Sequence, residues 1–250
     1  MTDLMTIEGL RSDGRTPGDL RNMTIKTNVI PSADGSVYME WGNNKLYVTV
    51  NGPFEAQPRH LQDPHRATIQ VNYSMSPFSC PDRKRPGPDR RAVEISKLLA
   101  ESLSKVVIRE RFPKTLIDVH IDIIEADAGT RCAGLTAASV AMAHAGIPMY
   151  DLVGAVSVGK VENIIILDPG KEEDSKGQAD MPVGIIPSTG EVVLLQMDGQ
   201  MNADEFNDAL KMAREAISNQ INKKQLDALK DSVRVVPFEE EDLPDEGGIY

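Results

Sequence analysis

The sequence lacks several features that define large classes of protein. Its 250 residues include only two cysteines, Cys80 and Cys132, without the paired spacing of a metal site, so we expect reduced thiols. No apolar run reaches the ~18 residues that a membrane helix needs, and the first ten residues lack the pattern of a signal peptide. We therefore expect a cytoplasmic protein without a membrane-spanning segment.

Basic charge is also scarce. The chain has 27 Lys and Arg against 38 Asp and Glu, a net charge of −11, which argues against a general nucleic-acid binder. The basic residues nevertheless gather between positions 59 and 91, where seven Arg or Lys stand against three Asp. This segment is suited to bind a polyanion locally. A basic loop that pairs with an acidic neighbouring segment is an alternative interpretation.

Hydrophobic periodicity and turn residues predict a domain that mixes strands with helices. Strands are predicted over 23–30, 36–42, 45–50, 67–75, 116–124, 152–159, 164–167, 179–186 and 192–196. The early strands are expected to form an antiparallel meander. Helices are predicted over 90–111, from Thr130 to a stop at Gly146, and after an N-terminal cap formed by Asn202 and Glu205. The order indicates an α/β (α+β) domain of two similar halves, with no sequence repeat that proves a duplication.

The ends of the chain differ from its middle. Residues 1–22 are polar and predict an extended N-terminal arm, followed by the domain at 23–236. The tail at 237–250 is acidic and is predicted to be disordered. The charged segment 168–177, between two predicted strands, is expected to be a mobile loop.

A candidate anion site lies at residues 127–139, where a predicted strand leads through a glycine into a helix of small residues. The first N–H groups of a helix lack intrahelical partners and suit an anion. Gly129 supplies the turn, Thr130 a hydroxyl, and Arg131 a planar cation for two phosphate oxygens. An ordinary strand-to-helix turn with a surface arginine has the same pattern.

Two further groups have residue types suited to phosphoryl chemistry. Arg90 and Arg91 fall in the first turn of a predicted helix. Cations at this end oppose the helix dipole, so the placement is mildly unfavourable unless an anion lies nearby. Asp174 and Asp180 form a carboxylate pair for acid catalysis or a divalent cation, although a charged loop beside a strand also explains them.

Other chemistries have weaker support in the sequence. Cys132 at a helix N-terminus is a possible nucleophile, but a buried apolar role is favoured. The alternating row of Asp118, His120 and Asp122 fits a metal site less well than a solvated or interface face of a sheet. Neither a Walker-type loop nor a nucleophile elbow is evident.

Together, short motifs over most of the chain resemble the RNase PH family, and within it the catalytic RNase PH-like subunit of the archaeal exosome. They lie at 11–15, 58–64, 84–91, 126–131, 167–169, 172–174, 179–182 and 195–199. The resemblance implies an RNase PH-type fold (ribosomal protein S5 domain 2-like), with mixed sheets and packed helices. It implies a 3′-to-5′ phosphorolytic exoribonuclease that degrades single-stranded RNA, releases nucleoside diphosphates and can run backwards to add tails.

The resemblance also implies roles for individual residues. Inorganic phosphate, the co-substrate, would bind at Gly129, Thr130 and Arg131. The RNA backbone would bind at Arg90 and Arg91, and a constriction for single-stranded RNA would be lined by Arg59 and His60. Asp174 and Asp180 would supply the acid and the ligands of Mg²⁺, with the roles not divided between them.

The implied assembly is a hexameric ring of three heterodimers with an inactive RNase PH-like homologue, capped by RNA-binding subunits. Asp118, His120 and Asp122 are candidates for its contacts. The alternative is a non-catalytic RNA-binding ring subunit of the same complex. A small-molecule kinase would need a denser Gly/Ser loop than 129–139 provides, and a hydrolytic RNase would not require phosphate.

Overall fold

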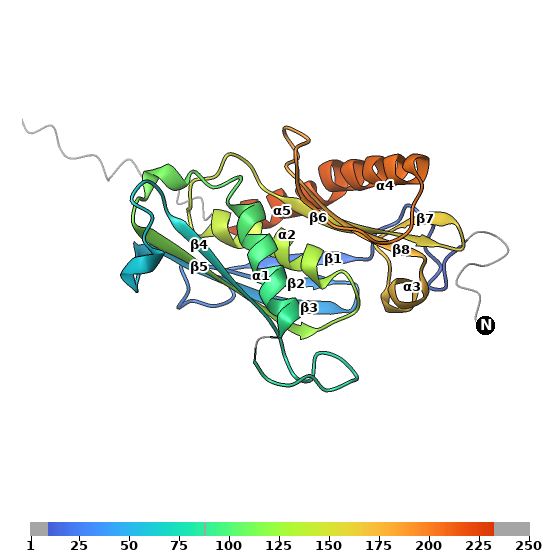
Figure 1. The fold of residues 1–250 in the computed structure, drawn as a ribbon, viewed down its shortest axis with the longest axis horizontal. Helices are drawn as coiled ribbons and strands as arrows, with labels where there is room; N and C mark the ends of the chain where they lie inside the picture. The colour runs from blue at the N-terminus through green and yellow to red at the C-terminus, as the bar shows by residue number, and fades with distance from the viewer. Residues whose placement is uncertain (1–9, 88, 233–250) are drawn as a thin grey trace, which may run out of the picture.

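The structure, a computed structural model, describes residues 10–87 and 89–232; the predicted acidic tail lies outside them. Its strands form two five-stranded sheets with helices packed against them (Figure 1). The first sheet has the order β1-β2-β3-β5-β4 and contains β1 (Met23–Thr27), β2 (Gly35–Trp41), β3 (Asn44–Glu55), β5 (Thr115–Glu125) and β4 (Thr68–Met75). No helix in the described ranges is long and apolar enough to cross a membrane.

The opening meander is confirmed for β1, β2 and β3, which pair antiparallel in sequence order. The fourth strand does not continue it. β5 lies between β3 and β4, and β4 runs parallel to β5. Parallel neighbours need a crossover, and helix α1 (Arg90–Leu103) lies in the connection between β4 and β5. The meander prediction was therefore wrong for β4.

Strand β5 shows the predicted alternation. Its apolar side chains at positions 117, 119, 121 and 123 are buried, whereas Asp118, His120 and Asp122 are partly or largely exposed on the other face. The imidazole of His120 contacts Asp118 at 2.9 Å. No group of three or more potential metal-ligating side chains is present among the described residues, so the metal interpretation of this row gains no support.

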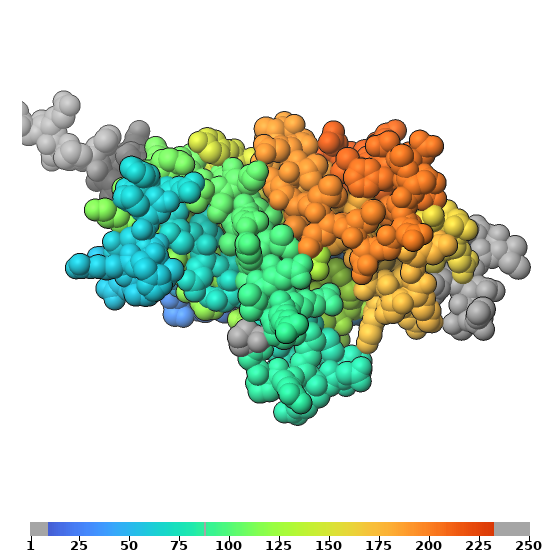
Figure 2. All heavy atoms as spheres, in the orientation of Figure 1, coloured from blue at the N-terminus to red at the C-terminus, as the bar shows by residue number. Residues whose placement is uncertain are grey.

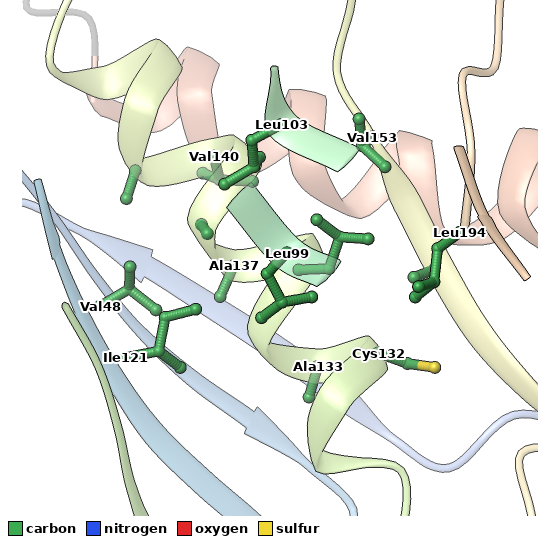
Figure 3. Close-up of a cluster of buried hydrophobic side chains, with 14 of the residues drawn as sticks. Val48, Leu99, Leu103, Ile121, Cys132, Ala133, Ala137, Val140, Val153 and Leu194 are labelled. Atoms are coloured by element: carbon green, nitrogen blue, oxygen red, sulfur yellow. The ribbon is translucent and has the colours of Figure 1, made fainter. Parts of the chain in front are cut away.

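Helix α2 (Thr130–His144) occupies the centre of the molecule and is buried on nearly all sides. Side chains of the first sheet, such as Val48 and Ile121, pack on one side of it, and Val153 and Leu194 lie on the other (Figure 3). Its small residues allow close approach. A Cβ on Gly134 would lie 3.2 Å from Ile121 Cγ2. The apolar core thus fixes where α2 begins, at the candidate anion site.

The second sheet pairs β8 (Ala179–Ile185) with β6 (Gly154–Val161), β9 (Val192–Leu195) and β10 (Asp198–Gly199), and β6 also pairs with β7 (Ile164–Leu167). Helix α2 packs on one face and α4 (Ala203–Ala216) on the other (Figure 1), so β6 is buried almost throughout. The predicted cap of α4 is confirmed, because Asn202 Oδ1 accepts from the N–H of Glu205 at 2.9 Å. A π-helical turn (Ile217–Ile221) leads into α5 (Asn222–Ser232).

One predicted helix had the wrong extent, and one predicted loop contains a helix. Helix α1 ends at Leu103 rather than at 111, and the chain then passes through turns to a 3-10 helix at Arg109–Arg111. Tertiary contact decides this, because Ile108 N–H is bonded to Pro148 O rather than within a helix. The segment 168–177, expected to be a mobile loop, contains helix α3 (Lys171–Lys176). Its Glu173 is buried in an ion pair with Arg11 at 2.5 Å, which holds the helix in place.

Candidate active site

The predicted anion site and the predicted carboxylate pair meet in one cavity of about 350 Å³. Gly129, just before α2, lines it together with Thr130 and Arg131 of α2. Asp174 lines it from α3 and Asp180 from β8. An adjoining cavity of about 710 Å³ shares Arg91, Arg131, Asp174 and Asp180 with the first and extends to β10. The loop after β4 completes the first cavity through residues 80–82, and Figure 2 shows this loop projecting from the body of the molecule.

The cradle at the start of α2 has the backbone geometry of an anion site. Ala128 and Gly129 have φ values of +55° and +67°, so two successive residues are left-handed before the helix begins at Thr130. Glycine adopts this conformation freely, whereas alanine does so under strain. Gly129 offers no side chain to cap the first turn of α2, so the free N–H groups of that turn remain suited to an anion.

The hydroxyl of Thr130 is held by a residue that the sequence did not single out. Tyr73, buried on β4, donates its phenolic hydrogen to Thr130 Oγ1 at 2.8 Å. Burial raises the pKa of Tyr73 to about 12, so the phenol remains a donor at neutral pH. Because Thr130 accepts this bond, its own hydrogen is available to an anion in the cradle.

Arg131 extends from the cradle toward the second cavity. Its Nη1 donates to Gln196 Oε1, and Gln196 Nε2 in turn donates to Glu94 Oε1 at 3.1 Å. The buried Nε of Arg131 has no hydrogen-bond partner among the described residues. A guanidinium held at one end with an unused donor suits an oxyanion.

The two carboxylates differ in environment. Burial raises the pKa of Asp180 to about 6, Asp174 and Asp198 add to the rise, and a hydrogen bond from Ser157 opposes it. Burial also raises the pKa of Asp174, while Arg91 is the largest influence in the other direction. A carboxyl group that titrates near neutral pH is suited to proton transfer.

The carboxylate pair also fits a magnesium site by its donor chemistry. Mg²⁺ is usually held by one or two carboxylates together with water and substrate phosphates, rather than by a cage of protein ligands. Asp174 and Asp180 line the same cavity as the cradle and offer this donor set.

The arginines of α1 are placed differently from each other. Asp89 caps the helix, accepting from the N–H of Ala92 at 2.6 Å. Both arginines are exposed, but Arg91 lines both cavities and Arg90 lines neither. The structure thus brings Arg91, and not Arg90, against the carboxylates and the cradle.

Arg59 and His60 lie outside this site. They form an exposed 3-10 helix, Arg59–Leu61, that is attached to the start of β4 by a bond from Thr68 Oγ1 to Leu61 O. The cavity lies beyond the other end of β4, near Met75. An eight-residue strand spans roughly 25 Å, so these two side chains belong to a separate region of the surface.

Sequence reasoning missed a group of residues in the segment before β1. Within the predicted arm, Arg11 is 1% exposed and Arg21 reaches into the core to contact Asp168 at 2.6 Å. The described part of the arm therefore packs against the body. The dense Arg-Ser-Asp-Gly-Arg cluster at 11–15 was the available signal, but nothing local indicated its partners.

Comparisons with known proteins cover most of the chain. Residues 19–148 match domain 1 of the 3′ exoribonuclease family (RNase PH), and residues 151–216 match its domain 2. The exosome complex component Rrp41 of Thermoplasma volcanium is 50% identical over 236 residues, which cover 94% of this chain and 95% of the relative. Rrp41 of Pyrococcus furiosus is 50% identical over 91% of each chain.

Solved structures share the fold. Rice (Oryza sativa) Rrp46 matches with a TM-score of 0.79 at 22% identity, covering 88% of this chain and all of that one. An Archaeoglobus fulgidus exosome with RNA bound to the active site matches with a TM-score of 0.73 at 24% identity, covering 88% and 92%. At these identities the likeness concerns the fold, and the predicted fold class is confirmed.

Proposed function

The chain belongs to the RNase PH family of 3′ exoribonucleases, and from this membership we propose that it is a catalytic exosome subunit of the archaeal type. Its reaction is 3′-to-5′ phosphorolysis of single-stranded RNA. The observation that carries the proposal is one cavity that contains an anion cradle, an arginine and two carboxylates with raised pKa values.

The cradle is proposed to hold inorganic phosphate, the nucleophile. The N–H groups at the start of α2, the hydroxyl of Thr130 and the guanidinium of Arg131 all suit its oxygens. The anion is therefore a substrate rather than a structural counter-ion, and Arg131 binds it beside the reacting centre.

The RNA 3′ end is proposed to enter past α1. Arg91, which lines the cavity, holds the backbone phosphates next to the site, and Arg90, on the same turn, holds the preceding stretch. Arg59 and His60, about a strand length away, line a constriction for the single strand. Contacts of this kind are made to the backbone, so binding is sequence-independent and weakens with salt.

In the chemical step an oxygen of inorganic phosphate forms a bond to the phosphorus of the 3′-terminal phosphodiester. The bond from that phosphorus to the 3′-oxygen of the preceding nucleotide breaks, and this oxygen takes up a proton. The products are a nucleoside diphosphate and an RNA shortened by one nucleotide. Asp174 and Asp180, which line the same cavity, hold or move this proton. When bound at these carboxylates, Mg²⁺ supplies neutralisation of the developing phosphate charge.

The proposed assembly is a hexameric ring of three heterodimers with an inactive RNase PH-like homologue, capped by RNA-binding subunits. It is supported by the names of the relatives, which are exosome complex components.

The bond energy retained in the diphosphate makes the reaction reversible, so excess nucleoside diphosphate drives RNA tailing.

The test is a decay assay on poly(A) with phosphate titrated from zero, run with the chain alone and with its ring partner. We expect nucleoside diphosphates to be released in proportion to shortening, and shortening to stop without phosphate. Release of monophosphates without phosphate would indicate hydrolysis instead. RNA binding without shortening under any condition would favour a non-catalytic ring subunit.

A further inference from the structure

Arg21 joins two segments of the candidate active site that are far apart in the sequence. Its guanidinium donates from Nη1 to the carbonyl of Asp127 and from Nη2 to the carbonyl of Ala128, at 3.4 Å, just before the cradle. From Nε and Nη2 it also donates to Asp168, at 3.0 and 2.6 Å, just before α3. The side chain is 8% exposed and lines neither active-site cavity.

On the cradle side, Arg21 fixes the direction of peptide groups. In a planar trans peptide the carbonyl and the following N–H point in opposite directions. Holding the carbonyls of Asp127 and Ala128 therefore turns the N–H groups of Ala128 and Gly129 away from Arg21. Asn44 assists, because its Nδ2 donates to Ala128 O at 2.7 Å. These bonds also stabilise the left-handed conformation of Ala128.

On the α3 side, Arg21 holds Asp168, which lies three residues before the start of the helix. Asp168 is 2% exposed and has a φ of +52°, a conformation that needs support from its surroundings. Its carboxylate accepts from the backbone N–H and side chain of Arg21 and from Trp41 Nε1 at 2.9 Å. The chain then runs through Pro169 and Gly170 into α3, which carries Asp174.

From this geometry we infer that Arg21 is a positioning residue that sets the cradle for phosphate against the carboxylate of Asp174. It touches neither the phosphate nor Asp174, and acts through two carbonyls on one side and Asp168 on the other. The inference rests on the proposed function, because that function assigns phosphate to the cradle and proton transfer to Asp174.

Only arginine meets the geometric demand at this position. One planar guanidinium presents five N–H donors in fixed directions, whereas a lysine ammonium is a single point of charge. A lysine at position 21 can pair with Asp168 or with the cradle carbonyls but cannot bond both at once and so fix their relative position. Arg21→Lys therefore keeps the charge and removes the link.

The test compares Arg21→Lys with Asn44→Ser in the assembly that gives wild-type activity, measuring kcat and the KM for phosphate. Asn44 bonds the cradle side, through Asp127 and Ala128, and makes no bond to Asp168. We expect Arg21→Lys to raise the KM for phosphate about tenfold and lower kcat 10- to 100-fold. We expect Asn44→Ser to raise the KM with less than a threefold change in kcat. RNA affinity without phosphate should be unchanged in both.

Arg21→Ala with added guanidinium provides a second measurement. Partial recovery of kcat by guanidinium, and none by an equal concentration of ammonium, supports the inference. A folded Arg21→Lys with wild-type kcat and KM would overturn it, as would equal losses of RNA binding and turnover. If the wild type itself releases no diphosphate with phosphate present, the proposed function fails, and that result is distinct from any difference between the variants.

Discussion

The hydroxyl of Ser157 on β6 donates a hydrogen bond to the carboxylate of Asp180 on the adjacent strand β8. The two residues are 23 positions apart in the sequence, and the side chains meet because β6 and β8 pair antiparallel. This bond favours the charged form of a carboxyl group whose burial favours the neutral one. The balance places the titration of Asp180 near neutral pH, where an acid is useful.

Ser157→Ala should move the pH dependence of turnover. Removing the hydrogen bond leaves the charge of Arg131 to oppose burial without it, so the pKa of Asp180 rises above its value of about 6. The midpoint assigned to Asp180 in a profile of kcat/KM from pH 5 to 8 should therefore shift to higher pH. Ser188→Ala, at an exposed serine, is the control. An unchanged midpoint in Ser157→Ala would contradict the role given to this bond.

Asp180→Asn should abolish turnover and yet stabilise the fold at pH 7. The folded-state pKa of Asp180, about 6, lies above the unfolded value of 3.8, so the folded protein binds the extra proton between these values. Stability contributed by this group is thus lost as pH rises from about 4 to about 6. We expect a gain of about 3 kcal/mol at pH 7 that disappears by about pH 3.5. Urea unfolding in EDTA measures it, and lower stability of the variant at pH 7 would refute the shift.

Tyr73→Phe should weaken phosphate binding while the fold persists. The variant loses the donor that leaves the Thr130 hydrogen free for the anion. A hydrogen bond of this kind contributes about 1 kcal/mol, which corresponds to a roughly fivefold rise in the KM for phosphate. RNA affinity should not change. Tyr150→Phe, at a residue 73% exposed, controls for the loss of a phenol, and an equal effect in both variants would remove Tyr73 from the cradle.

Arg131→Glu should raise the phosphate requirement sharply, because it replaces a cation in the cradle with a charge that repels the anion. Phosphate titration of the decay assay is the measurement. Lys211→Glu makes the same charge change at an exposed position of α4 and should leave the titration unchanged. A wild-type phosphate dependence in Arg131→Glu would exclude Arg131 from the phosphate site.

Gly35→Ala should destabilise the protein by about 2–3 kcal/mol. A Cβ at this position would lie 2.2 Å from Ala141 O and 2.7 Å from Ala145 Cβ, so β2 and the end of α2 must separate. Gly18→Ala is the matched control, since a Cβ there meets nothing within 4 Å. The free energies of unfolding of the two variants are compared, and equal values would show that α2 can shift without cost.

Local sequence patterns determined several secondary-structure elements and helix caps of this protein. The alternation along β5, the Asp89 cap of α1 and the Asn202–Glu205 cap of α4 depend on neighbouring residues, and each was predictable. The motifs around positions 90, 130, 174 and 180 likewise identified the residues of the candidate site, because each motif keeps its own short spacing.

Tertiary structure decided how these pieces meet. The parallel pairing of β4 with β5, the helix at 171–176 and the bonds of Tyr73 to Thr130 and of Arg21 to Asp168 all join distant segments. Arg21 and Asp168 are 147 residues apart, and nothing near either one indicates the other. The sequence alone determined which polar and charged groups are available to the candidate site. Their distances, burial and shifted pKa values arose only when the two sheets closed around α2, because those quantities depend on desolvation and on neighbours that packing supplies.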